Sequence, residues 1–157
     1  MRPYPEEVIR AIQGGVAAHF APELRSTYSQ AQFAFSMMLF TIAQRDYDSA
    51  VPDLLDANKT LRSVLADAAA ALEGIAGDAA AVARTALAAL PPAAGSLRLS
   101  DLRKENEALR DGVCTLAPLI EPAEDIAQLA PLRPARAAIY AFLLEDARRR
   151  IVPILTV

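Results

Sequence analysis

The residues of this sequence whose chemistry could support catalysis are few. There is one histidine, His19, and one cysteine, Cys114. A di-iron or di-manganese site in a helical bundle needs Glu-x-x-His pairs, and a catalytic zinc site commonly uses several histidines. We therefore expect His19 to be a packed or half-exposed residue near a helix end. Cys114 has no base near it in sequence, so we expect a small buried side chain and no nucleophile.

Four aspartates lie close together in sequence, at Asp46, Asp48, Asp53 and Asp56. Hard cations bind clustered carboxylates, so a metal-dependent hydrolase is one alternative function. However, the glycine and the terminal glutamate of an EF-hand are absent, and the acids do not form the paired motifs of helical nucleotide pyrophosphatases. The positive end of a helix dipole explains Asp53 and Asp56 without a metal. We predict no metal site, no cofactor and no enzymatic activity.

The most informative pattern is an internal echo. The segment Asp53-Leu54-x-x-x-Asn58-x-x-Leu61-Arg62 recurs 48 positions later as Asp101-Leu102-x-x-x-Asn106-x-x-Leu109-Arg110. Extending both copies gives two stripes whose members are three and four residues apart in alternation, which is the spacing of core positions in coiled coils. The first stripe is Val51, Leu54, Asn58, Leu61, Leu65, Ala68 and Leu72, and the second is Leu99, Leu102, Asn106, Leu109, Val113, Leu116 and Ile120.

Each stripe carries one asparagine where an apolar residue is expected. An unpartnered buried amide costs about 1–3 kcal/mol, so both asparagines should be hydrogen-bonded. One antiparallel helix separates the two predicted helices, which should therefore run parallel, and we predict that Asn58 and Asn106 lie level in the interior. Three alternatives stay open: a chance similarity, a position at the edge of the stripe, or a polar spot that holds a ligand together with Phe35 and Met38.

Arginines surround the last predicted helix. Arg133 and Arg136 flank its start, and Arg148, Arg149 and Arg150 close it. Cations at a helix C-terminus are expected from the dipole alone. The alternative is that Arg136, Arg148 and Arg149 bind the anion of a phosphate-bearing partner.

The stretch from Phe33 to Ala43 is apolar on more than one side of a helical wheel. One stripe is Tyr28, Ala31, Phe35, Met38 and Ile42, and a second is Phe33, Met37 and Phe40. A helix that is apolar most of the way round must be covered on most sides. We therefore predict that this helix is the centre of a bundle. Because Met and Phe also adapt to ligands, binding of an apolar or acyl ligand beside it is a second function hypothesis.

Helical periodicity, caps, glycines and prolines predict an all-α protein, an up-and-down four-helix bundle with extra short helices at the termini, in one domain over residues 1–157. Gly14-Gly15 should kink or end the first helix, either where two backbones approach closely or at a gap that admits a ligand. A turn is predicted at 46–49. The predicted helices are 5–20, 22–46, 49–73, 79–90, 101–120, 122–129 and 135–152, the last stopped by Pro153.

Composition narrows the partners. The chain has 157 residues and a net charge of −3, which gives no electrostatic drive toward nucleic acid. The N-terminus has no apolar signal-peptide core, and no apolar run reaches the roughly 20 residues that a membrane span needs. One cysteine allows no intrachain disulfide, which fits a reducing compartment. We expect a cytoplasmic protein, and the alanine-rich helix 79–90 could serve as a homodimer surface.

The opening Arg2-Pro3-x-Pro5-Glu6-Glu7-Val8-Ile9, the apolar second helix and the Leu-x-x-x-Asn-x-x-Leu-Arg segments resemble a bacterial family of small all-helical proteins of unknown function. Members are often encoded beside acyl-CoA dehydrogenases and phosphotransferase-like kinases. The resemblance implies an accessory role and carries over no catalytic residue. We therefore expect a non-enzymatic scaffold or partner-binding protein, as a homodimer or with another protein partner.

Overall fold

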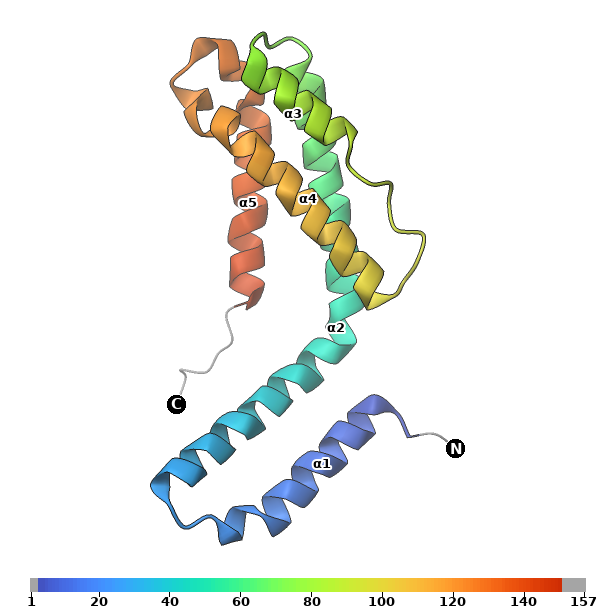
Figure 1. The fold of residues 1–157 in the computed structure, drawn as a ribbon, viewed down its shortest axis with the longest axis vertical. Coiled ribbons are helices and arrows are strands. Elements are labelled where there is room, and N and C mark those ends of the chain that lie inside the picture. The colour runs from blue at the N-terminus through green and yellow to red at the C-terminus, as the bar shows by residue number, and fades with distance from the viewer. Residues whose placement is uncertain (1–2, 151–157) are drawn as a thin grey trace. The chain divides into compact units, whose positions relative to one another are not determined.

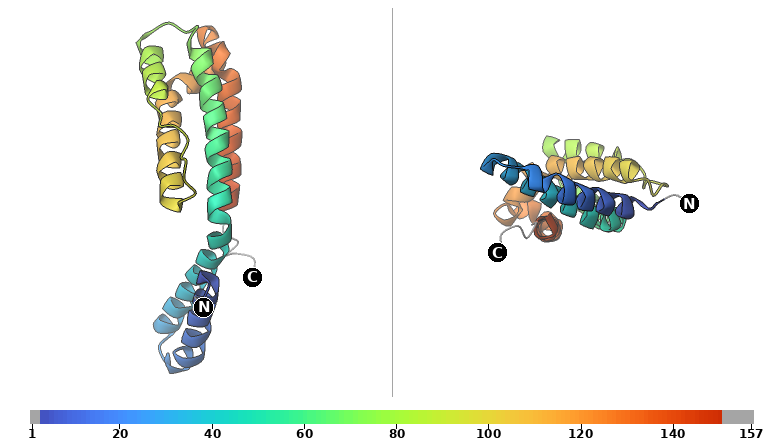
Figure 2. Two further views of the ribbon diagram at one scale, coloured as in Figure 1. Left: turned by 90° about the vertical axis from the view of Figure 1, so that its right-hand side faces the viewer. Right: turned by 90° about the horizontal axis from the view of Figure 1, so that it is seen from below.

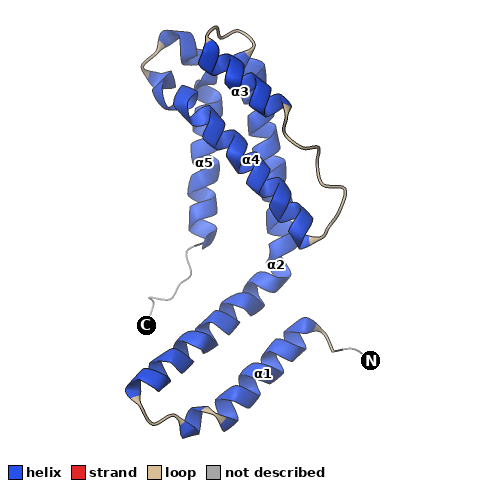
Figure 3. Ribbon diagram, viewed as in Figure 1, coloured by secondary structure: helices blue, strands red, loops and turns tan. Residues whose placement is uncertain are grey.

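The chain is helical throughout the range that the computed structural model describes, residues 3–150, and that range contains no strand (Figure 3). The predicted all-α class is confirmed. The α-helices are α1 (Pro5–His19), α2 (Thr27–Leu72), α3 (Asp78–Ala88), α4 (Leu99–Ile120) and α5 (Arg133–Arg150) (Figure 1). Short 3-10 helices are η1 (Ala21–Glu23), η2 (Glu121–Glu124) and η3 (Ala127–Leu132). Within residues 3–150, no helix combines the length and apolar character needed to cross a bilayer.

The contacts divide the chain into two compact units, Met1–Ala50 and Val51–Val157. The first holds α1, η1 and the first part of α2, which lie side by side as a helical hairpin. The second holds the rest of α2 and all later helices. Each unit is described by itself below, and a single domain over 1–157 stays a prediction.

The turn predicted at 46–49 is wrong, because α2 continues without interruption from Thr27 to Leu72. Pro52 lies inside the helix, although a proline there lacks the N–H of the backbone ladder and typically costs about 3 kcal/mol. The predicted turn contains no glycine, and aspartate, tyrosine and serine are only moderately unfavourable in helices. Local polarity was therefore too weak a signal to end the helix.

The glycine pair in α1 does not end or bend it at a close backbone contact. The helix continues past Gly14 and Gly15 to His19, and a Cβ atom added at either glycine would meet no atom of the chain within 4 Å. At the start of α1, the backbone N–H of Tyr4 donates to the Glu7 carboxylate at 3.0 Å. This contact satisfies one of the N–H groups that a helix start leaves unpaired.

The predicted central helix is also wrong as the centre of a core within this chain. Phe35 is 53% exposed and Leu39 is 48% exposed, while Met38 and Ile42 are half-buried. Among the side chains described in residues 3–50, none is buried. The apolar pattern predicted that this helix is covered, and within the described residues the chain does not bury it.

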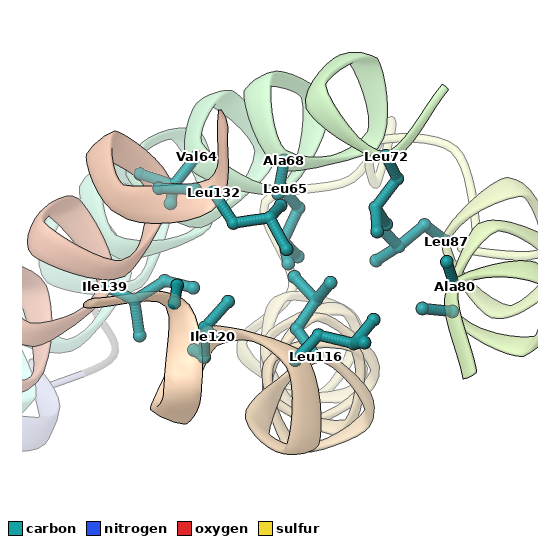
Figure 4. Close-up of a cluster of buried hydrophobic side chains, with 14 of the residues drawn as sticks. Val64, Leu65, Ala68, Leu72, Ala80, Leu87, Leu116, Ile120, Leu132 and Ile139 are labelled. Atoms are coloured by element: carbon teal, nitrogen blue, oxygen red, sulfur yellow. The ribbon is translucent and has the colours of Figure 1, made fainter. Parts of the chain in front are cut away.

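The core lies instead in the second unit, where the two predicted stripes face inward. Leu61, Leu72, Leu102, Leu109 and Leu116 are each at most 1% exposed. Figure 4 shows side chains from α2, α3, α4, η3 and α5 directed at one another. Each fully buried leucine contributes about 1.5–3 kcal/mol relative to an exposed one. These five leucines of α2 and α4 are therefore a main source of stability.

Figure 2 (left) shows the second unit as two layers, with α3 and α4 in one and α2 and α5 in the other. Hydrogen bonds join Asn58 of α2 to Leu102 and Asn106 of α4. Another joins Arg62 of α2 to Glu105 of α4. Further along, a Cβ added at Gly112 would lie 3.4 Å from Leu65. Residue numbers rise together on both helices, so α2 and α4 run in the same direction, as predicted.

Arg84 closes the C-terminal end of α2. Its Nη1 donates to the carbonyl oxygens of Leu72 at 2.7 Å and Ile75 at 2.9 Å. Leu72 is the last residue of α2, and its carbonyl also accepts from the backbone N–H of Ile75 at 3.1 Å. The last carbonyls of a helix have no partner within its regular hydrogen-bond ladder, and a guanidinium also complements the negative end of the helix dipole. The α2–α3 connection is thereby fixed by a residue of α3.

The C-terminal elements differ from prediction in detail. The predicted helix 122–129 is two 3-10 helices, and α5 begins at Arg133 instead of residue 135. Pro118 lies inside α4, which continues to Ile120. In α5, Ile139 is buried, whereas Leu143, four residues later, is 39% exposed. The predicted helix end at 151–152 and its stop at Pro153 lie outside the described residues.

Candidate functional site

A buried pair of amides joins α2 and α4. Asn58 is 3% exposed and Asn106 is 6% exposed. Nδ2 of Asn106 donates to Oδ1 of Asn58 at 2.7 Å, and Nδ2 of Asn58 donates to the carbonyl oxygen of Leu102 at 3.0 Å. The prediction that the two asparagines lie level in the interior and are hydrogen-bonded, to each other or to neighbouring polar groups, is confirmed, and the structure shows both kinds of partner.

Arg110 and Asp146 extend this pair toward α5. Nε of Arg110 donates to Oδ1 of Asn106 at 2.8 Å, and its Nη2 lies 2.8 Å from Oδ2 of Asp146. The guanidinium also lies 5.6 Å from the ring centre of Phe142. We call Asn58, Asn106, Arg110 and Asp146 the polar row.

The two ends of the polar row fix the orientation of both amides. A guanidinium can only donate, so the oxygen of Asn106 must face Arg110 and its NH2 must face Asn58. Asn58 must then accept through its oxygen and donate to a backbone carbonyl, which can only accept. Because each step determines the next, the row specifies one register of α2 against α4.

A second polar contact ties the segment between α3 and α4 to the same helices. Glu105 is 7% exposed, and its carboxylate accepts from Nε of Arg62 at 2.6 Å and from the backbone N–H of Ala94 at 2.9 Å. Nη2 of Arg62 donates to the carbonyl oxygen of Pro91 at 2.9 Å. Sequence analysis missed this cluster. Its signal was the arginine four residues after the asparagine in each echo copy, since Arg62 and Arg110 both bind carboxylates of another segment.

An open groove lies beside this cluster, with a volume of about 350 Å³. Its lining is apolar apart from the Arg62 side chain and comes from α2, α3, α4 and the segment between α3 and α4. The other lining residues are Leu65, Ala66, Ala69, Leu87, Leu90, Pro91, Pro92 and Leu109. Because Arg62 is already bound to Glu105, the groove offers mainly apolar contact.

The structure does not gather the acidic residues into a metal site. Within the part of the chain described, no group of three or more histidine, cysteine, aspartate or glutamate side chains could hold a metal ion. Asp46 pairs with Arg45 at 2.9 Å, and Asp56 lies 3.6 Å from Arg149. Asp53 is exposed, and the side chain of Asp48 lies outside the described part.

The one histidine and the one cysteine of the chain are both exposed. His19 lies in the last turn of α1, as expected, but its side chain is exposed, so the prediction that it is packed or half-exposed is wrong. Cys114 lies in α4 but is exposed, so the prediction of a buried small side chain is wrong. It falls five residues after Leu109, and this places it on the solvent side of the helix.

Arg136, Arg148 and Arg149, the predicted anion-binding residues, each bind a carboxylate. Arg136 lies 3.4 Å from Glu124, while Arg148 and Arg149 lie 4.0 and 3.4 Å from Glu145. The side chain of Arg150 lies outside the described part. An anion would have to compete with these carboxylates, and binding of one stays a prediction.

Tyr140 forms a short contact beside Arg136. Its hydroxyl donates to the Glu121 carboxylate at 2.5 Å, and Arg136 lies 4.9 Å from the ring centre. The hydrogen bond to Glu121 raises the pKa of Tyr140 above the ordinary value of 10.0, because ionisation would place two negative charges together. The nearby Arg136 lowers this pKa in part.

The remaining candidate is a surface in the first unit. Phe35, predicted to bind a ligand, belongs to it, whereas Met38, predicted with it, is half-buried. Both lie in the first unit, and Asn58 and Asn106 lie in the second. We define the apolar hairpin surface as the exposed large apolar residues of 3–50. They are Tyr4, Val8, Ile12, Phe20, Tyr28, Phe35, Leu39 and Tyr47, exposed by 39% to 74%.

Comparison with protein families, with curated proteins and with solved structures finds no match to this chain.

Proposed function

We propose that this chain is a non-enzymatic, cytoplasmic partner-binding protein whose contact surface is the apolar hairpin surface. One observation carries the proposal: no side chain described in residues 3–50 is buried, although eight large apolar side chains there are exposed. Contiguous exposed apolar surface of more than a few hundred Å² marks interaction sites in soluble proteins.

Energetics support an external cover for the hairpin. Ordering a residue costs about 1–2 kcal/mol of backbone entropy, and burial of apolar surface must offset that cost. Small helical elements without a core of their own are normally stabilised by a metal, a disulfide or association. The first unit has no disulfide, since the chain has a single cysteine. We therefore infer that association with a partner stabilises the first unit.

The second unit supplies the scaffold in this proposal. We infer an up-and-down four-helix bundle made of α2 from Val51, α3, α4 and α5. The shared direction of α2 and α4 supports this, as does Arg149 of α5 lying near Asp56 while Leu132 packs in the core by Ala68 (Figure 4). The polar row gives that bundle one register. The accessory role implied by the family resemblance agrees with a protein whose first unit contacts the partner and whose second unit is the scaffold.

Cross-linking in extracts of the source cells tests the proposal. The full-length chain should become linked to a defined protein, and a Phe35→Glu variant should lose that link. Val82→Glu is the matched control, because Val82 is 64% exposed on α3 and takes the same charge change outside the hairpin. If no link depends on Phe35, the apolar hairpin surface is not the contact surface.

The groove beside Arg62 favours a second candidate, binding of an apolar or acyl ligand. Its volume of about 350 Å³ lies within the usual range for small-molecule pockets, and apolar side chains line it beside Arg62, although the groove is open to solvent and also exposes polar atoms. Native mass spectrometry of the purified chain would detect a bound acyl compound. Loss of that compound on Leu87→Glu, with retention on Phe35→Glu, would favour this candidate over the first.

A further inference from the structure

We propose that the partner of the apolar hairpin surface is a second copy of this chain. In this dimer, the stripe of Tyr28, Ala31, Phe35, Met38 and Ile42 on one copy packs against the same stripe on the other. The inference rests on the proposed function and names its partner.

The spacing of the stripe is that of a helix-to-helix seam. Its members follow one another at three, four, three and four residues, as core positions of coiled coils do. The small side chain of Ala31 lies between the large side chains of Tyr28 and Phe35 along the stripe, so the same surface has protruding side chains and a depression. A surface that carries both can match a copy of itself across a two-fold axis.

Burial shows that this stripe is the more exposed of the two on α2. Tyr28 is 74% exposed and Phe35 is 53% exposed, and Ala31 is exposed as well. Met38 and Ile42 are half-buried, as are Phe33, Met37 and Phe40 of the second stripe. The N-terminal part of the stripe therefore has the largest apolar surface left to an external partner.

Charge on the hairpin is arranged as at the centre of an interface. From Ser26 to Gln44 no residue is charged, and from Ala11 to Pro22 there is no Asp, Glu, Lys or Arg. Depletion of charge with enrichment of aromatic residues and methionine is the compositional signature of interface cores. Two copies of such a surface meet without bringing like charges together, whereas a surface helix facing water carries charges on its outer side.

The available area matches a dimer. Tyrosine and phenylalanine bury about 150–250 Å² each, and five of the eight residues of the apolar hairpin surface are of these types. Tyr28 and Phe35 of the stripe, together with the other six residues of that surface beside it, offer on the order of 800 Å² per copy. A standard stable interface buries about 800 Å² per partner. A lipid surface fits less well, because residues 1–50 contain four arginines, five acids and no lysine, and membrane-surface helices are typically basic.

Sedimentation of the full-length chain at about 1–100 µM tests the inference. The wild-type chain should sediment with twice its mass of 16.8 kDa. Phe35→Glu should weaken association by about 100-fold or more, since each dimer would bury two unpaired carboxylates. Val82→Glu should leave the dimer intact.

A second variant guards against unfolding of the hairpin. Tyr28→Glu places an acid in the first turn of α2, where the dipole favours negative charge, so each isolated helix should gain stability. Dimerisation should nevertheless be lost, with helical circular dichroism retained. A dimer that survives both substitutions would overturn the inference, as would a wild-type chain that stays monomeric at about 100 µM.

The outcomes separate this inference from the proposed function. A monomeric chain that cross-links to a different protein through Phe35 keeps the proposed function but excludes the second copy. A monomeric chain that instead cosediments with neutral phosphatidylcholine vesicles, and loses this with Phe35→Glu, excludes both protein partners. If the chain is monomeric and binds neither another protein nor the vesicles, both the proposed function and the dimer are wrong.

Discussion

The side-chain amide of Asn106 donates a 2.7 Å hydrogen bond to the side-chain oxygen of Asn58, 48 positions earlier in the chain. Both side chains are at most 6% exposed, and the pair is flanked by the carbonyl oxygen of Leu102, which can only accept, and the guanidinium of Arg110, which can only donate. A helix slipped by one turn would leave both amides buried without partners, at about 1–3 kcal/mol each. The pair thus sets how α2 and α4 align.

Removal of one amide should be more costly than removal of both. Asn58→Leu leaves Nδ2 of Asn106 without its buried acceptor, so the free energy of unfolding should fall by about 1–3 kcal/mol. Asn58→Leu with Asn106→Leu should cost less than the sum of the single changes, with a coupling of about 0.5–3 kcal/mol. Urea unfolding measures both, with exposed Ser63→Leu as the control. Strict additivity would mean that the hydrogen bond contributes nothing.

Arg110→Lys should destabilise the chain although it keeps the positive charge. The guanidinium donates to Asn106 through Nε and to Asp146 through Nη2, and a lysine cannot reproduce this planar fork. We expect a loss of about 1–2 kcal/mol in the free energy of unfolding by urea denaturation, since hydrogen bonds to charged groups contribute about 1.5–3 kcal/mol and Arg110 is partly exposed. Arg103→Lys on the exposed side of α4 should change little. Equal stabilities for the two variants would show that charge alone matters at Arg110.

Glu105→Gln should loosen the segment between α3 and α4. The carboxylate holds the Ala94 N–H and the Arg62 guanidinium, which in turn binds the Pro91 carbonyl. Trypsin should therefore cut after Arg98 several-fold faster in the variant, because cleavage follows the population of the open segment. Mass spectrometry of the fragments measures this rate. Glu107→Gln, at an exposed position, should not change it.

Tyr140 should ionise at a higher pH than an unperturbed tyrosine, because Glu121 accepts its hydrogen bond and raises its pKa. A group with a raised folded-state pKa stabilises the fold at pH values below its unfolded pKa, and this contribution is lost as pH rises through the folded pKa. Stability should therefore decline above about pH 10. Absorbance titration near 295 nm checks it, with Tyr140→Phe to identify the residue. Glu121→Gln should move the pKa of Tyr140 downward, and no movement would contradict the assignment.

Sequence reasoning succeeded where two segments constrain each other. The echo predicted that Asn58 and Asn106 pair, because an amide in an apolar stripe needs a partner and the matching stripe offers one at the same level. Helix α4 was predicted nearly in full for the same reason. These are patterns in which periodicity and hydrogen-bond satisfaction both give the same answer.

Sequence reasoning failed where a residue pattern is compatible with more than one structure. The apolar stretch around Phe35 required burial, but periodicity does not say whether the cover belongs to the same chain. The polar run before Pro52 resembled a turn, yet nothing in it prevents a helix. The contact of Glu105 with the Ala94 N–H could not be found because backbone groups carry no sequence signal, whereas its contact with Arg62 had a signal in the arginine of the echo.

Amide hydrogen exchange of the full-length chain, measured at several protein concentrations, tests the central claim most directly. If a second copy covers the hairpin, protection of amides 28–42 should rise with concentration over about 1–100 µM, since association stabilises by mass action. Protection of amides 61–72, in the bundle with its own core, should stay constant. Protection of 28–42 that is high and independent of concentration over this whole range would contradict the account.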